Sequence, residues 1–134
     1  MNCHFYFIKF YIFIYNINRE DIIMTTNTNT VMELKINGIK WSVIEVPYIE
    51  CKEDTLTLGE THYGESIIYI QENKIDTMIR TFTHELLHAW LFEYGYDQEK
   101  EFTNEDMCNI VSASYSFISK YTEKYKKLKY NIPE

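Results

Sequence analysis

Two histidines and a glutamate in one short run, His84-Glu85-Leu86-Leu87-His88, are the residues of this chain best suited by type and spacing to chemistry. On a helix, residues four apart lie on the same face, so the imidazoles of His84 and His88 can bind one metal ion. Neutral imidazole is a common ligand of zinc. A carboxylate beside such a site, here that of Glu85, can take a proton from water that the metal has activated. The run therefore predicts a hydrolytic zinc site.

The residues around this run favour a helix that is packed on most of its sides. Residues 75–94 contain no Gly or Pro, and Gly95 follows at a position typical of a helix C-cap. Winding these residues at about 100° each gathers apolar side chains into one broad face and a second strip, with the histidines between them. We expect the histidine face to be turned toward an internal cleft. The alternative is two core histidines satisfied by hydrogen bonds, with Glu85 exposed.

A catalytic zinc site needs a third protein ligand and leaves its fourth position to water. Thr103 or Asn104 can cap a second helix, expected to run to about Tyr125, which places Glu105 in the first turn. We predict Glu105 as the third ligand, with Asp106 as its main rival, because an antiparallel second helix could bring this turn beside the histidines. The alternative for Glu105 is an ordinary acidic residue favoured by the helix dipole.

Further roles around the metal rest on weaker signals. Asn109 could hold a ligating imidazole by its second ring nitrogen, and Cys108 is expected to be a small buried residue rather than a fourth ligand. The oxyanion of the reaction needs one donor besides the metal. Residue type alone offers His62, Tyr63 and Tyr115. For His62, a turn histidine exposed to water is the favoured alternative.

The motif, with Glu105 following His88 by 17 residues, resembles the gluzincin-type zinc metallopeptidases. It is similar in particular to the small ImmA/IrrE-like metallopeptidases and their phage-encoded relatives. The resemblance spans about residues 32–118 and is most specific at 82–90 and 104–109. It implies one Zn²⁺ per chain and hydrolysis of a peptide bond, with a regulatory protein such as a helix-turn-helix repressor as the expected substrate. The larger gluzincin pattern has Asp where this chain has Asn109, which weakens only the role given to that side chain.

The elements before the motif helix are expected to be strands. Asn37-Gly38 interrupts alternating sequence and predicts a hairpin. The expected strands are residues 34–36, 39–46, 55–61 and 66–70, with a turn at 62–65. Four strands followed by two helices predict an α+β fold, a minimal zincin-like domain. If strand 66–70 is the sheet edge nearest the cleft, an extended peptide substrate could pair with it there.

Length and composition fit one small domain. The chain has 134 residues, 46% of them hydrophobic, and a net charge of −7, which gives no help to a nucleic-acid ligand. The three cysteines, Cys3, Cys51 and Cys108, are far apart and odd in number, which favours a reducing, cytoplasmic location.

The first 30 residues differ from the rest. Phe5 to Tyr15 is an aromatic run too short to span a membrane, and a polar linker follows it. We predict that residues 1–30 lie outside the fold, that residues 31–134 form a single domain, and that Met24 or Met32 could be the true start. No stable membrane association is expected.

Three functional readings remain open from the sequence. The first is a zinc-dependent peptidase acting on a protein or peptide. The second is a zinc-binding regulatory or interaction module that no longer cuts. The third is a metal-free interaction domain. The intact Glu85 favours the first, since binding alone needs no general base.

Overall fold

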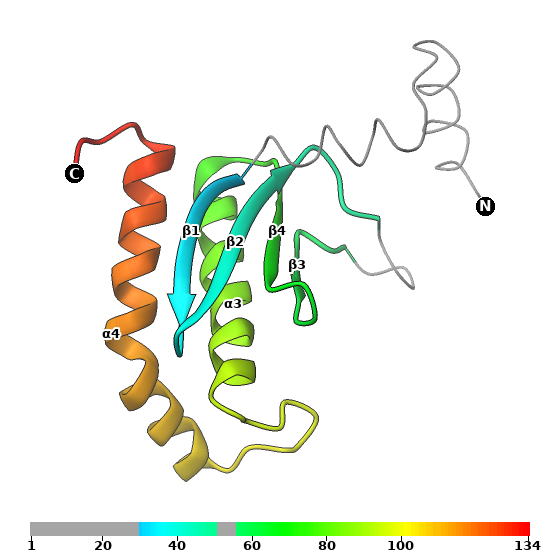
Figure 1. Cartoon of the computed structure of the whole chain (residues 1–134), viewed down its shortest axis with the longest axis vertical. Coiled ribbons are helices and arrows are strands. Elements are labelled where there is room, and N and C mark those ends of the chain that lie inside the picture. Colours follow the sequence, from blue (N-terminus) through cyan, green and yellow to red (C-terminus); the bar gives the residue numbers. More distant parts are fainter. Residues whose placement is uncertain (1–29, 51–55) are drawn as a thin grey trace.

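The computed structural model describes residues 30–50 and 56–134, which form one four-stranded sheet and two helices (Figure 1). In chain order the elements are β1 (Thr30–Ile36), β2 (Ile39–Val46), β3 (Gly59–His62), β4 (Ile67–Gln71), α3 (Ile75–Glu93) and α4 (Asn104–Lys129). The predicted α+β class is confirmed. Nearly all of the predicted leader, and Cys51, lie outside the described residues. Within these two ranges, no helix is long and apolar enough to cross a bilayer.

The strand order of the sheet is β1-β2-β4-β3. β1 and β2 form the predicted antiparallel hairpin, and its turn residues Asn37 and Gly38 both have positive φ, at 48° and 83°. β4 then pairs parallel to β2 and antiparallel to β3. The condition under which strand 66–70 could receive a substrate is therefore not met, because β4 lies inside the sheet. The edge near the motif helix is β3, which is shorter than predicted.

The core lies between one face of the sheet and the helices. Along β1, buried and exposed residues alternate, as expected for a sheet with one covered face. Figure 1 shows α3 lying behind the sheet, roughly along the strands, with α4 beside it. The largest fully buried side chains come from both strands and helices: Trp41, Tyr125, Phe82, Ile36, Ile68, Ile70, Leu86 and Val43.

Helix α3 ends where the sequence predicts. Gly95, with φ of 77°, follows its last turn, and the Tyr96 N–H donates to the Leu91 carbonyl at 2.9 Å. This pair of features is typical of a Schellman motif. The Trp41 indole N–H donates to the Glu93 carboxylate at 2.8 Å, which ties the β1–β2 hairpin to this end of α3.

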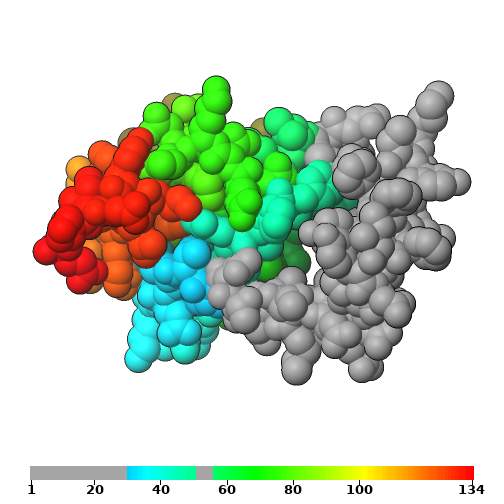
Figure 2. All heavy atoms as spheres, turned by 90° about the horizontal axis from the view of Figure 1, so that it is seen from above, coloured from blue at the N-terminus to red at the C-terminus, as the bar shows by residue number. Residues whose placement is uncertain are grey.

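Helix α4 continues past the predicted end near Tyr125 to Lys129, and its last turns are anchored to the sheet. The ring of Tyr125 stacks on Phe82 at 4.5 Å, and its hydroxyl donates to Glu45 on β2 at 2.7 Å. The Lys129 ammonium donates to the same carboxylate at 2.9 Å. Burial, then Glu45, raises the pKa of Tyr125 well above its ordinary value. Figure 2 shows this end of α4, in red, beside the start of the sheet.

Removing the buried hydroxyl should measurably weaken this anchor. Tyr125→Phe keeps the stacked ring but deletes a hydrogen bond to a half-buried carboxylate, so we expect about 1 to 2 kcal/mol less stability to urea. Tyr130→Phe is the matched control, because the Tyr130 hydroxyl bonds Asp76 at the exposed surface. Equal effects of the two substitutions would mean that Glu45 does not hold α4 through Tyr125.

Candidate metal centre

Helix α3 places the two motif histidines with their outer ring nitrogens together. The Nε2 atoms of His84 and His88 are 3.2 Å apart. Two nitrogen ligands of one tetrahedral zinc, each bound at 2.0 to 2.1 Å, are separated by roughly 3.4 Å. The pair therefore needs little rearrangement to hold one ion. The expected internal cleft is wrong for His84, whose side chain is 68% exposed.

Glu85 is the buried member of the motif. It is only 8% exposed, and the Thr61 hydroxyl contacts both its carboxylate Oε2, at 2.7 Å, and its main-chain carbonyl, at 3.1 Å. The other oxygen, Oε1, lies 4.0 Å from His84 Nε2. The alternative of an exposed Glu85 is therefore wrong. One carboxylate oxygen is fixed by β3 and the other faces the histidines.

The close approach of β3 to α3 depends on Gly59. A Cβ at this position would lie 2.6 Å from Thr81 Cγ2 and 2.8 Å from Glu85 Cγ, closer than real Cβ atoms come. Any side chain would push β3 away from the motif helix and pull Thr61 from Glu85. A glycine within a strand often marks such an approach, and it is the one sequence signal that could have pointed to this contact.

The second ring nitrogen of His88 is held by a residue that the sequence analysis missed. His88 Nδ1 lies 2.6 Å from Oε1 of Gln98, in the segment between the two helices. The Tyr63 hydroxyl approaches the same oxygen at 3.4 Å. Asn109, predicted for this role, is exposed on α4. No helical spacing links Gln98 to the motif, so nothing in the sequence pattern marked it.

The predicted third ligand is not beside the histidines. In the part of the chain that the structure describes, no group of three or more His, Cys, Asp or Glu is placed to hold a metal ion. Glu105 is exposed in the first turn of α4, eight residues before Ala113, which lies near Trp90 on α3. Eight helical residues span roughly 12 Å, which carries this turn past the end of α3.

Asp106, the rival ligand, is engaged in capping α4. Its carboxylate accepts from the Thr103 main-chain N–H at 2.9 Å and from the Thr103 hydroxyl at 2.8 Å, while the Asp106 N–H donates back to Thr103 at 3.1 Å. These bonds lower the pKa of Asp106. Cys108 is exposed, so the prediction that it is buried is wrong. It faces solvent on the side of α4 away from the core.

The three oxyanion candidates differ in their surroundings and in their contacts with the motif. His62 ends β3 and pairs with Glu60 at 2.9 Å. Tyr63 packs on Phe92, with ring centroids 4.7 Å apart, and burial raises its pKa, so its hydroxyl stays a donor. Tyr115 is 67% exposed on α4. Of the three, Tyr63 is the one whose hydroxyl reaches Gln98, the residue that contacts His88.

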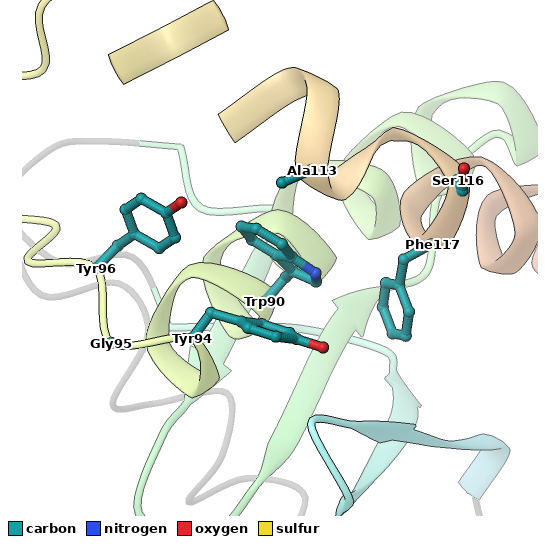
Figure 3. A pocket seen from close by; sticks show the side chains of 7 residues that line it. All are labelled: Trp90, Tyr94, Gly95, Tyr96, Ala113, Ser116 and Phe117. Carbon is teal, nitrogen blue, oxygen red and sulfur yellow. The ribbon is translucent and has the colours of Figure 1, made fainter. Parts of the chain in front are cut away.

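Two cavities flank α3. The larger, about 450 Å³, is lined mainly by aromatic rings and has no titratable carboxylate, imidazole or thiol (Figure 3). In Figure 3 the rings of Trp90 and Tyr94 stack beneath Ala113 of α4. The smaller, about 330 Å³, is lined by Thr83 and Leu87, the residues just before His84 and His88. The smaller cavity lies between α3 and α4, and neither motif histidine lines it, whereas the larger one lies toward the end of α3.

The chain matches no protein-family model, no curated protein and no solved structure. The resemblance to gluzincin-type metallopeptidases therefore depends on the motif residues themselves and stays a prediction from the sequence.

Proposed function

We propose that this chain is a zinc-dependent peptidase of the cytoplasm, in which His84 and His88 hold the metal and Glu85 is the general base. The observation that carries the proposal is the arrangement of these three side chains. Two imidazole Nε2 atoms converge to 3.2 Å, and a nearly buried carboxylate is fixed beside them by one hydroxyl. Burying a carboxylate is unfavourable unless its contacts or its use compensate. A purely structural histidine pair would not need it.

In the proposed hydrolysis, the metal and the side chains of the protein have separate tasks. Zinc, when bound, polarises the scissile carbonyl and makes water more acidic. Glu85 takes the proton of the attacking water and passes it to the leaving amine. Thr61 holds Oε2 of Glu85, so that Oε1 is the oxygen turned toward the histidines. Of the three oxyanion candidates we favour Tyr63, whose hydroxyl would leave Gln98 Oε1, 3.4 Å away, to donate to the substrate oxyanion.

The substrate that suits this surface is an extended peptide segment. β3 lies against α3 at Gly59 and Thr61, and in residues 30–50 and 56–134 no strand pairs with its outer side, where a strand could be added. A segment paired there would run past the motif. As the resemblance implies, a regulatory protein such as a helix-turn-helix repressor is the first substrate to try.

Glu105 stays the third ligand predicted from the sequence, although the first turn of α4 does not lie beside the histidines, and zinc titration tests it. Its rival, Asp106, already has its carboxylate bonded to Thr103. In zinc titrations, Glu105→Ala should bind more weakly than wild type, whereas Asp106→Asn should bind normally and unfold at a lower temperature because it weakens the helix cap. Normal zinc binding by Glu105→Ala, with loss of binding in Asp106→Asn, would mean that Asp106 and not Glu105 is the third ligand.

A second candidate function is a zinc-binding interaction module without proteolysis. The exposure of His84, and the distance of Glu105 from it, favour this alternative. It predicts zinc binding that Glu85→Gln leaves intact, and no cleavage of any candidate protein by wild type. Cleavage by wild type that is lost in Glu85→Gln would exclude it.

A further inference from the structure

Gln98 makes the shortest side-chain contact of the motif histidines. Its Oε1 lies 2.6 Å from His88 Nδ1, while His88 Nε2 faces His84 Nε2 at 3.2 Å. Gln98 is ten residues beyond His88, in the segment that joins α3 to α4. A turn holds this segment in place, because the Glu99 N–H donates to the Asp97 carboxylate at 3.1 Å. The turn at Asp97–Glu99 therefore fixes the backbone that carries the Gln98 side chain to His88.

The chemistry of this contact selects one tautomer of His88. An amide oxygen only accepts, so the nitrogen facing it must carry the proton. A neutral imidazole protonated at Nδ1 has its lone pair at Nε2. That is the nitrogen turned toward His84, where a metal would bind. Without the acceptor, the proton is free to occupy Nε2, which blocks coordination by that atom.

We propose that Gln98 is a positioning residue for a metal ion, acting through His88 by fixing its Nδ1–H tautomer and the orientation of its ring. The part that concerns the metal rests on the proposed function, whereas the tautomer does not. Partners of this kind typically change metal affinity by about 10- to 100-fold. The Tyr63 hydroxyl, 3.4 Å from the same oxygen, helps to keep the amide oxygen turned inward.

The tautomer can be measured in protein freed of metal by a chelator. At a pH of about 8, above the ordinary histidine pKa of about 6.5, ¹⁵N spectra of the imidazoles distinguish protonated from unprotonated ring nitrogens. We expect His88 to be protonated at Nδ1 in wild type and in Gln98→Glu, which keeps an acceptor. Gln98→Met, similar in length but without an acceptor, should show a mixture. The same tautomer in Gln98→Met as in wild type, or an Nε2–H form in wild type, would overturn the proposal.

Metal affinity gives the second measurement, by titration with Zn²⁺ against a competing chelator. We expect Gln98→Met to bind about 10- to 100-fold more weakly and Gln98→Glu to restore affinity to within a few-fold of wild type. Glu99→Gln, on the same turn, is the control and should bind normally. Equal affinity of Gln98→Met and wild type, while His88→Ala loses binding, would overturn the role of Gln98. If His88→Ala binds as wild type does, the metal site itself fails, and the NMR result still decides the tautomer.

Discussion

Glu85→Gln should keep its zinc and lose hydrolysis by about 10²- to 10⁴-fold, the range that general acid–base catalysis contributes. Gln has the shape of Glu, and its amide oxygen can still accept from the Thr61 hydroxyl, so the packing of β3 on α3 is preserved. It cannot take a proton from water. The measurement is cleavage of a candidate repressor by wild type and variant, with zinc content determined on the same samples.

The matched control is Glu72→Gln, an exposed carboxylate just before α3, which should cleave as wild type does. Hydrolysis that survives in Glu85→Gln and still depends on zinc would exclude Glu85 as the general base. Loss of zinc in Glu85→Gln would instead make this carboxylate part of the metal site.

Alanine at His84 or at His88 should abolish tight zinc binding. Each change removes a direct ligand, so the loss should exceed the roughly 10- to 100-fold expected for an outer partner. Wild type made with ample zinc should contain one zinc per chain by elemental analysis. His84 is mostly exposed, so His84→Ala should unfold in the absence of metal much as wild type does.

A third histidine provides the control for these variants. His62 lies at the end of β3 and pairs with Glu60, so His62→Ala should retain a full equivalent of zinc. Substoichiometric metal in wild type, or full retention in both His84→Ala and His88→Ala, would contradict the proposed centre.

The features that the sequence predicts well are those set by neighbouring residues. The β1–β2 hairpin follows from the backbone freedom of Asn37-Gly38, and the end of α3 from Gly95. The sheet order was missed because β2 and β4 pair in parallel across a long connection, and strand periodicity does not say which strands become neighbours.

The same division applies to the candidate site. The sequence spacing of His84, Glu85 and His88 is enough to place them close together, because all three lie within two turns of one helix. Thr61 and Gln98 reach the motif from a strand and from an irregular segment, where no period relates them to it. The prediction for Glu105 needed the register of α4 along α3, which depends on packing contacts such as the Thr83–Thr122 hydroxyl pair at 3.0 Å.

The shortness of β3 also bears on self-association. An unpaired strand edge can recruit another copy of the chain and start an aggregate, and proteins blunt such edges by keeping them short or charged. β3 has only four residues, and the opposite edge, β1, carries exposed Glu33 and Lys35. Four residues offer too few main-chain bonds to hold an arbitrary unfolded chain for long. An edge of this length disfavours aggregation of the protein. It also restricts strand pairing at β3 to partners that bind elsewhere on the surface as well.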